Sequence, residues 1–145
     1  MARDTTTGMN LRGLVGMRLQ QVCPKRGLDV LENQVVGTRP GGQDNRMPFV
    51  LVKKSNEDVR GIVACKVQNT GGTAEQKVPF EIIRLLEAMK FDKRHRHAWL
   101  VLGGIGWTAD LVDYYIDGLQ VYIPKMKGKV TVLGFDDLLS ETFEL

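Results

Sequence analysis

Residues 61–68 read Gly-Ile-Val-Ala-Cys-Lys-Val-Gln and are followed over residues 69–77 by Asn-Thr-Gly-Gly-Thr-Ala-Glu-Gln-Lys. The first part is rich in apolar and β-branched residues and predicts a buried strand with a polar end. Because side chains alternate across a strand, Ala64, Lys66 and Gln68 should share one face. A lysine in that position either extends to solvent or is held at a site on the face of the sheet, and spacing alone favours the first.

A hairpin and a helix are predicted on either side of this stretch. Two β-rich runs, Phe49–Val52 and Val59–Val67, are separated by a polar turn at 55–58, which is the pattern of a hairpin. After a polar, glycine-bearing loop at 68–72, apolar residues at helical spacing predict a helix with Pro79 in its first turn.

The rest of the chain alternates between helix and strand patterns. We expect a polar, frayed terminus over residues 1–7, a helix over Leu11–Val22, a strand over Leu28–Val36, a loop over Thr38–Arg46, a strand over Ala98–Leu102, a helix over Ala109–Leu119, a strand over Val130–Leu133 and a short helix over Asp136–Phe143. This α-β-β-β-α-β order predicts an α/β fold with a mixed β-sheet flanked by helices.

Length and composition indicate one ordinary globular domain. The chain has 145 residues, of which 43% are hydrophobic, and it shows no internal repeat or low-complexity linker. No apolar run reaches the about 18 residues of a membrane helix, and we expect neither a signal peptide nor a membrane partner. Cys23 and Cys65 do not make a disulfide framework and predict a reducing, cytoplasmic location.

The charges are distributed unevenly along the chain. Residues 1–97 carry 17 Lys and Arg against 10 Asp and Glu, whereas residues 98–145 carry 3 against 7. The formal net charge of +3 conceals this asymmetry. A basic body is suited to a polyanion, and the acidic end should then face away from it or contact another subunit, but clustering of solvated charges explains the pattern equally well.

The central stretch and its surroundings resemble the PD-(D/E)XK nuclease superfamily. The similarity is carried by the run Pro48–Val52 and by the strand that ends Ala64-Cys65-Lys66-Val67-Gln68. Residues 69–81 are similar to the loop and helix start that follow E-x-K-x-Q in some restriction-type and phage nucleases, and residues 101–107 look like a strand and turn of those proteins. The resemblance runs from about Leu28 to Leu139 and implies a restriction-endonuclease-like core.

The resemblance also implies a catalytic site. In that superfamily an Asp and the Glu of E-x-K bind Mg²⁺, together with the backbone carbonyl of the middle residue, and the Lys polarises the attacking water. Hard oxygen ligands suit Mg²⁺, which activates water, and a lysine stabilises charge in the transition state. Lys66 then matches the catalytic lysine, and Gln68 matches a glutamine of the similar subgroup. The metal ligands would be Asp44, the Cys65 carbonyl and a carboxylate at Ala64, with Mn²⁺ expected to substitute for Mg²⁺.

The chain departs from the superfamily pattern at the acids. Ala64 cannot bind a metal, and no Asp follows Pro48-Phe49, which leaves Asp44 as the nearest acid on that side. Three interpretations remain open: an inactivating change introduced at position 64, a naturally inactive member that binds DNA or a partner, or migration of the acid to Glu75 or Glu81.

Basic and polar side chains around the implied site predict contacts to double-stranded DNA. The alternative is a solvated, solubilising surface. The candidate DNA-binding residues are Arg39, Arg46, Lys53, Lys54, Asn69, Thr70, Lys77, Arg94 and Arg96.

The sequence thus predicts a Mg²⁺-dependent DNA endonuclease of restriction or phage type, impaired by Ala64. Such an enzyme would work in a prokaryotic or phage-infected cytoplasm. Cutting both strands of a duplex takes two sites, so a homodimer or a second subunit is expected. The alternatives are a structure-selective nuclease, such as a Holliday junction resolvase, and a non-catalytic DNA-binding or partner subunit with the same fold.

Overall fold

The computed structural model describes residues 3–67, 73–103 and 113–145, and side chains within 11–67, 77–103 and 113–145. A five-stranded sheet has the order β1-β2-β3-β4-β5, in which neighbours in sequence are neighbours in space. Its strands are β1 (Leu28–Thr38), β2 (Asp44–Lys53), β3 (Arg60–Val67), β4 (His95–Gly103) and β5 (Val130–Gly134). The first three strands pair antiparallel and the last three pair parallel, so the predicted mixed sheet is confirmed.

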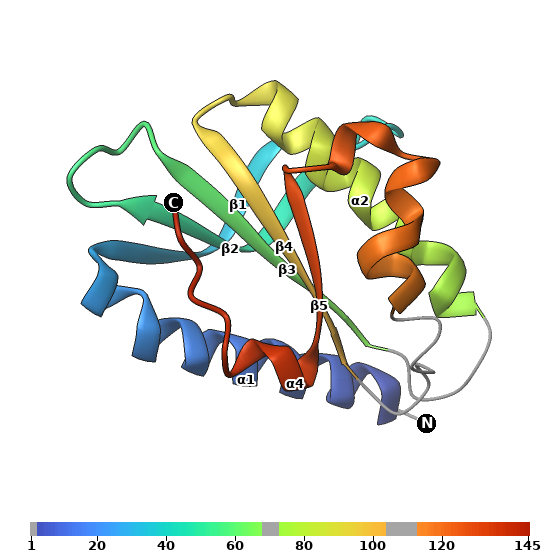
Figure 1. Ribbon diagram of the computed structural model, residues 1–145, viewed down its shortest axis with the longest axis horizontal. Helices are drawn as coiled ribbons and strands as arrows, with labels where there is room; N and C mark the ends of the chain where they lie inside the picture. Colours follow the sequence, from blue (N-terminus) through green and yellow to red (C-terminus); the bar gives the residue numbers. More distant parts are fainter. Residues whose placement is uncertain (1–2, 68–72, 104–112) are drawn as a thin grey trace.

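Helices cover both faces of this sheet. Figure 1 shows α1 (Arg3–Val22) and the short α4 (Phe135–Leu138) along one face, and α2 (Thr73–Phe91) with the helical turns of residues 114–126 on the other. The single turns are η1 (Pro24–Arg26), η2 (Tyr114–Gly118), η3 (Leu119–Val121) and η4 (Pro124–Met126). Two buried apolar clusters result, one between the sheet and α1 and one between the sheet and α2.

The central strands explain why the fold forms around the quoted stretch. In β3 the residues from Gly61 to Ala64 are all buried, and in β4 every residue from Ala98 to Gly103 is buried. A strand that is covered on both faces reads as a continuous apolar run rather than as an alternation. The α-β-β-β-α-β order predicted from the sequence is therefore the order observed.

Several predicted boundaries are wrong. The first helix begins at Arg3, so residues 3–7 are helical rather than frayed. The loop expected over Thr38–Arg46 is shorter, because Thr38 ends β1 and pairs with Asp44, the first residue of β2. The Arg39 N–H donates to the Gln43 carbonyl over 2.7 Å and closes the turn between them.

Two predicted helices also differ. Pro79 lies inside α2, which begins six residues earlier at Thr73, so its placement in the first turn is wrong. The last helix ends at Leu138, and Phe143 adopts a φ of 50° that brings its ring into the α1-side cluster. A tertiary contact with Trp99, 5.2 Å between ring centroids, takes the place of a helical continuation.

The remaining expectations lie partly outside the described residues. The loop at 68–72 and residues 109–112 of the helix expected over Ala109–Leu119 are among these. The described part of that helix is built from η2 and η3. Among the described helices, none combines the length and apolar character needed to cross a membrane.

Two glycine substitutions test the close approach of Gly37 in β1 to Phe91 at the end of α2. Gly37 has a φ of +76°, and a Cβ there would lie 2.7 Å from Cγ of Phe91. Gly37→Ala should lower the free energy of unfolding by about 1–2 kcal/mol, the cost of a left-handed L-residue. Gly13→Ala, in the interior of α1 with open space around it, should raise that energy by up to about 1 kcal/mol. Urea denaturation measures both free energies, and equal effects of the two substitutions would contradict the left-handed conformation of Gly37.

Candidate functional site

The end of β3 presents Lys66 toward α2. Ala64 is 5% exposed and belongs to the α2-side cluster, whereas Cys65 and Val67 pack against the α1-side cluster. By the alternation of a strand, Lys66 lies on the same face as Ala64, as the sequence predicts. Its side chain is half-buried. The strand thus carries a cation at the polar end of an otherwise apolar face.

Ala64, where the resemblance implies the motif acid, is a buried core residue, and so is Val50 on the neighbouring strand β2. Val50 directly follows Pro48-Phe49 and is 1% exposed. It belongs to the same α2-side cluster as Ala64. The two side chains therefore share one apolar layer beneath α2. In a chain with acids at these positions, two carboxylates would enter that layer from adjacent strands.

Asp44 lies on a different part of β2. The pairing of β2 with β3 ends at Phe49–Val63, so the beginning of β2 pairs with β1 alone. The Asp44 carboxylate is largely exposed, and its Oδ2 lies 3.8 Å from Arg46 Nη2. An exposed pair of this kind contributes little to stability. The strand pairing thus gives Asp44 no direct link to Ala64 or Lys66.

A polar network ties α2 to the beginning of β2. The Arg84 side chain donates through Nη1 to both carboxylate oxygens of Glu81, at 3.2 and 3.1 Å, and through Nε to Asn45 Oδ1 at 3.1 Å. Its Nη2 donates to the Arg46 carbonyl at 2.9 Å, and the fully buried Asn45 amide donates back to the Arg84 carbonyl at 3.0 Å. The Arg84 and Glu81 side chains are each only 16% exposed.

The charge of Glu81 reaches the end of β3. Burial raises the pKa of the Cys65 thiol to about 11; Arg12 opposes this increase, and the Glu81 carboxylate adds to it. Cys65 directly precedes Lys66, so this influence of Glu81 acts at the end of the strand that carries the lysine. We call residues 64–67 of β3, together with Asn45, Glu81 and Arg84, the motif end.

The described residues of the motif end do not fit a Mg²⁺ site. Mg²⁺ takes oxygen ligands and is usually held by one or two carboxylates. Ala64 and Val50 offer none, and the Glu81 carboxylate is bonded to Arg84. In the ranges that the structure describes, no group of three or more His, Cys, Asp or Glu side chains is placed to hold a metal ion.

The predicted DNA-binding residues separate into two groups. Near the motif end, Arg46 and Lys77 are exposed, and the Arg39 guanidinium lies 5.6 Å from the centroid of the Phe80 ring. Gln68, Asn69 and Thr70 lie outside the described residues, as does the side chain of Glu75.

The second group lies toward the opposite ends of the strands. Lys53 Nζ lies 3.4 Å from the Leu145 carbonyl, and Lys54 pairs with Asp29 at 3.7 Å. Arg94 and Arg96 lie on either side of His95, which pairs with Arg60 at the beginning of β3. Arg60 precedes Lys66 by six residues, so these arginines lie roughly 20 Å along the strand from Lys66. The structure therefore does not bring the predicted basic cluster together.

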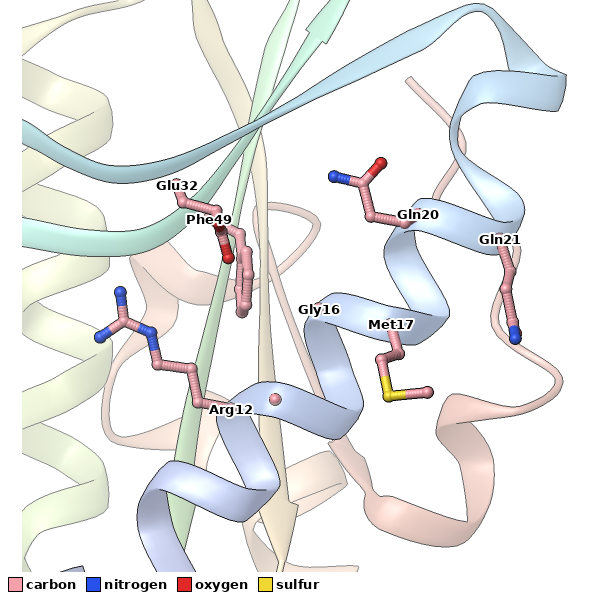
Figure 2. A pocket seen from close by; sticks show the side chains of 8 residues that line it. Arg12, Gly16, Met17, Gln20, Gln21, Glu32 and Phe49 are labelled. Atoms are coloured by element: carbon pink, nitrogen blue, oxygen red, sulfur yellow. The ribbon is translucent and has the colours of Figure 1, made fainter.

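A shallow cavity of about 690 Å³ lies between α1 and the β1–β2 pair (Figure 2). The guanidinium carbon of Arg12 is 6.0 Å from the centroid of the Phe49 ring, and Glu32 is on the same rim. Because Phe49 belongs to the α1-side cluster, this cavity opens on the face of the sheet away from Lys66. It is therefore separate from the motif end.

Sequence reasoning named Glu81 but missed Asn45 and Arg84. Arg84 follows Glu81 by three residues, a spacing at which side chains meet on a helix, and this signal was available. Asn45 lay in the segment interpreted as loop, and its contact partner is 39 residues away in the sequence. No local pattern encodes that contact.

A family model described as a PD-(D/E)XK nuclease superfamily domain matches residues 7–145. No curated protein and no solved structure matches the chain.

Proposed function

Because the chain belongs to the PD-(D/E)XK nuclease superfamily, with its restriction-endonuclease-like mixed sheet, we propose that it acts on double-stranded DNA at the motif end. In this proposal it is an endonuclease domain of restriction or phage type in which Ala64 and Val50 replace the metal-binding acids. The chain then binds DNA but cleaves it poorly. Hydrolysis with Mg²⁺ or Mn²⁺ requires carboxylates at those positions.

One observation supports this proposal above the others. Lys66 is half-buried and aligned with Ala64 on a face where the surrounding residues are apolar. A phosphodiester bound at this end of the face would meet the Lys66 ammonium group, which would stabilise developing negative charge. The assignment of Lys66 as the catalytic lysine rests on this position and on the superfamily motif.

Two carboxylates of this chain, Asp44 and Glu81, are candidates for the acid of the motif. Asp44 is exposed and carried by the β1–β2 pair, whereas Glu81 is half-buried and its charge acts on Cys65. Within the proposal, Glu81 is the better placed of the two, but Arg84 holds it. The Cys65 carbonyl and Gln68 keep the proposed roles of backbone ligand and subgroup glutamine.

Double-strand cleavage by a domain of this size requires a second active site. A homodimer or a second subunit is therefore part of the proposal. A junction resolvase would share the motif end and differ in the geometry of the DNA it binds, so linear and four-way substrates are compared in the same assay.

DNA binding by the unaltered chain is the first test. We expect Arg46→Ala with Lys77→Ala to weaken duplex binding about tenfold and to reduce the salt slope of log K by about two, because each lost phosphate contact removes about one counterion. Fluorescence anisotropy over a salt series measures both quantities.

Lys25→Ala with Arg26→Ala is the matched control, since both residues are exposed in η1, beside the Lys54 backbone rather than the motif end. This control should leave the Kd within about twofold of that of the unaltered chain. The tenfold change expected for Arg46→Ala with Lys77→Ala corresponds to about 1.4 kcal/mol, so the two variants are easily told apart. Equal losses in both variants, or binding that does not depend on salt, would overturn the proposed DNA surface.

A further inference from the structure

A second cationic site lies at the C-terminal end of α2, beside the beginning of β4. A pocket of about 610 Å³ is formed by the last turns of α2, the beginning of β4, η4 and the residue before β5. This volume is in the range of small-molecule sites. Its lining residues are Leu86, Glu87, Met89, Lys90, Lys93, His95, Arg96, Lys125 and Lys129. We call it the basic pocket.

The charges around the basic pocket are unbalanced. Five cationic side chains face a single carboxylate, that of Glu87. Arg94, next to this pocket in the sequence, is by contrast paired with Asp92, 2.6 Å between Nη2 and Oδ2. None of the five lining cations forms an ion pair with another described residue. Such a concentration of positive charge, drawn from four separate segments, attracts anions.

His95 lines the pocket and carries a buried polar atom that has no partner among the described residues. The His95 side chain is only 3% exposed, and its Nδ1 lies 3.0 Å from the Asp92 carbonyl. Since a carbonyl only accepts, Nδ1 carries a hydrogen and donates. The other ring nitrogen, Nε2, is buried and has no hydrogen-bond partner within the described part of the chain. A buried group in this condition is left for a ligand or a water.

The pocket is apolar on one side. Met89 is buried and Leu86 is half-buried, and both line the cavity beside the cations. A bare inorganic anion would use only the cationic part. A molecule that combines a phosphate with a flat ring uses both parts.

We propose that the basic pocket binds a nucleotide, with its phosphate between the lysines and His95 Nε2 and its base against Leu86 and Met89. The phosphate accepts from the cationic side chains, and Nε2 becomes a donor when it is protonated. The site is independent of the motif end, because it lies at the beginning of β4 rather than at the end of β3.

Binding should change the protonation of His95. Burial lowers its pKa in the free protein, Asp92 opposes that decrease, and Arg60 and Arg94 add to it. The other charged groups that face it are Glu87, Lys90, Lys93, Arg96, Lys125 and Lys129 of the pocket. A phosphate beside Nε2 favours the imidazolium, so the pKa of His95 should rise on binding.

Calorimetric titration with deoxyadenosine monophosphate tests the proposal. We expect Lys125→Ala with Lys129→Ala to raise the Kd at least tenfold, because two charge-assisted contacts are lost. Lys127→Ala is the matched control, since Lys127 is exposed in the same segment but does not line the pocket. It should leave the Kd within twofold. Deoxyadenosine, which lacks the phosphate, should bind at least tenfold more weakly than the monophosphate.

NMR of the His95 ring adds a readout that surface charge alone does not move. The nucleotide should raise the pKa of His95 in the unaltered chain, and His95→Phe should weaken binding while retaining an aromatic ring. If His95→Phe does not fold, the variant Lys125→Ala with Lys129→Ala, whose residues are exposed, still tests whether the basic pocket binds the nucleotide. Absence of binding at millimolar nucleotide, equal weakening by Lys127→Ala, or equal affinity for deoxyadenosine would overturn the proposal.

The source of the nucleotide is settled by two further probes. If binding of a single-stranded oligonucleotide with a 5′-phosphate is weakened by Lys125→Ala with Lys129→Ala, the ligand is a DNA end. Dependence seen only with the monophosphate identifies a free nucleotide. If the two lysine substitutions weaken binding only of a blunt duplex without terminal phosphates, and not of the monophosphate, the lysines contact the DNA backbone. That result would overturn the proposed nucleotide pocket.

Discussion

A chain carrying Val50→Asp together with Ala64→Glu is expected to nick supercoiled plasmid DNA with Mg²⁺ or Mn²⁺, whereas the unaltered chain cleaves little or not at all. Val50 and Ala64 belong to one buried cluster on the same face as Lys66, so acids at both positions would lie on that face. Ala64→Glu alone should give a smaller gain, because Asp44 is carried by the β1–β2 pair. Plasmid nicking and cleavage of four-way junctions are followed in parallel.

The matched control for this variant is Val50→Asn with Ala64→Gln, which has nearly the same shape and no negative charge. Adding Lys66→Ala to the acid variant should lower its rate by about 10²–10³-fold, the usual effect of losing one group that stabilises the transition state. Cleavage by the amide control would point to a contaminating nuclease. An acid variant that folds and binds DNA but never cleaves would favour the non-catalytic alternative.

Arg84→Met is expected to lower the free energy of unfolding by about 3 kcal/mol. The substitution leaves the half-buried Glu81 carboxylate and the buried Asn45 amide without their common partner. Breaking a buried ion pair typically costs about 3–5 kcal/mol, and the residual exposure of this pair places the loss at the lower end. Urea denaturation followed by circular dichroism measures the loss.

Two further variants separate the network from packing. Glu81→Leu with Arg84→Met should recover much of the lost stability, since replacing both charges removes the unpaired group. Lys54→Met breaks the exposed pair with Asp29 and should change the unfolding free energy by less than about 0.5 kcal/mol. A loss below 1 kcal/mol for Arg84→Met would contradict the proposed role of the network in fixing the motif end.

The strands and their order were predictable because the determinants are local. The apolar run in β3, its polar end and the turn at 55–58 are visible in the sequence, and the alternation that puts Lys66 with Ala64 follows from strand geometry. The same reasoning failed at the beginning of β2. Asp44, Asn45 and Arg46 are polar and look like a loop, but pairing with β1 and the hydrogen bonds of Arg84 make them a strand.

The candidate site was predictable in part for the same reason. The motif indicated Lys66 and the missing acid at position 64, because both lie within one strand. The burial of Val50 and Ala64 in one cluster depends on how two strands and α2 pack, and Arg84 enters through a contact across 39 residues. The basic pocket collects side chains from four segments, so the sequence named Arg96 as a candidate cation but not the side chains that surround it.

We propose that Val50 and Ala64 occupy the two positions of a metal-binding acid pair beside Lys66. Calorimetric titration of Mn²⁺ into the Val50→Asp, Ala64→Glu variant tests it most directly. We expect the acid variant to bind Mn²⁺ and to gain thermal stability on binding, while the amide control and the unaltered chain show neither effect. An acid variant that binds Mn²⁺ no more tightly than the folded amide control would contradict the claim.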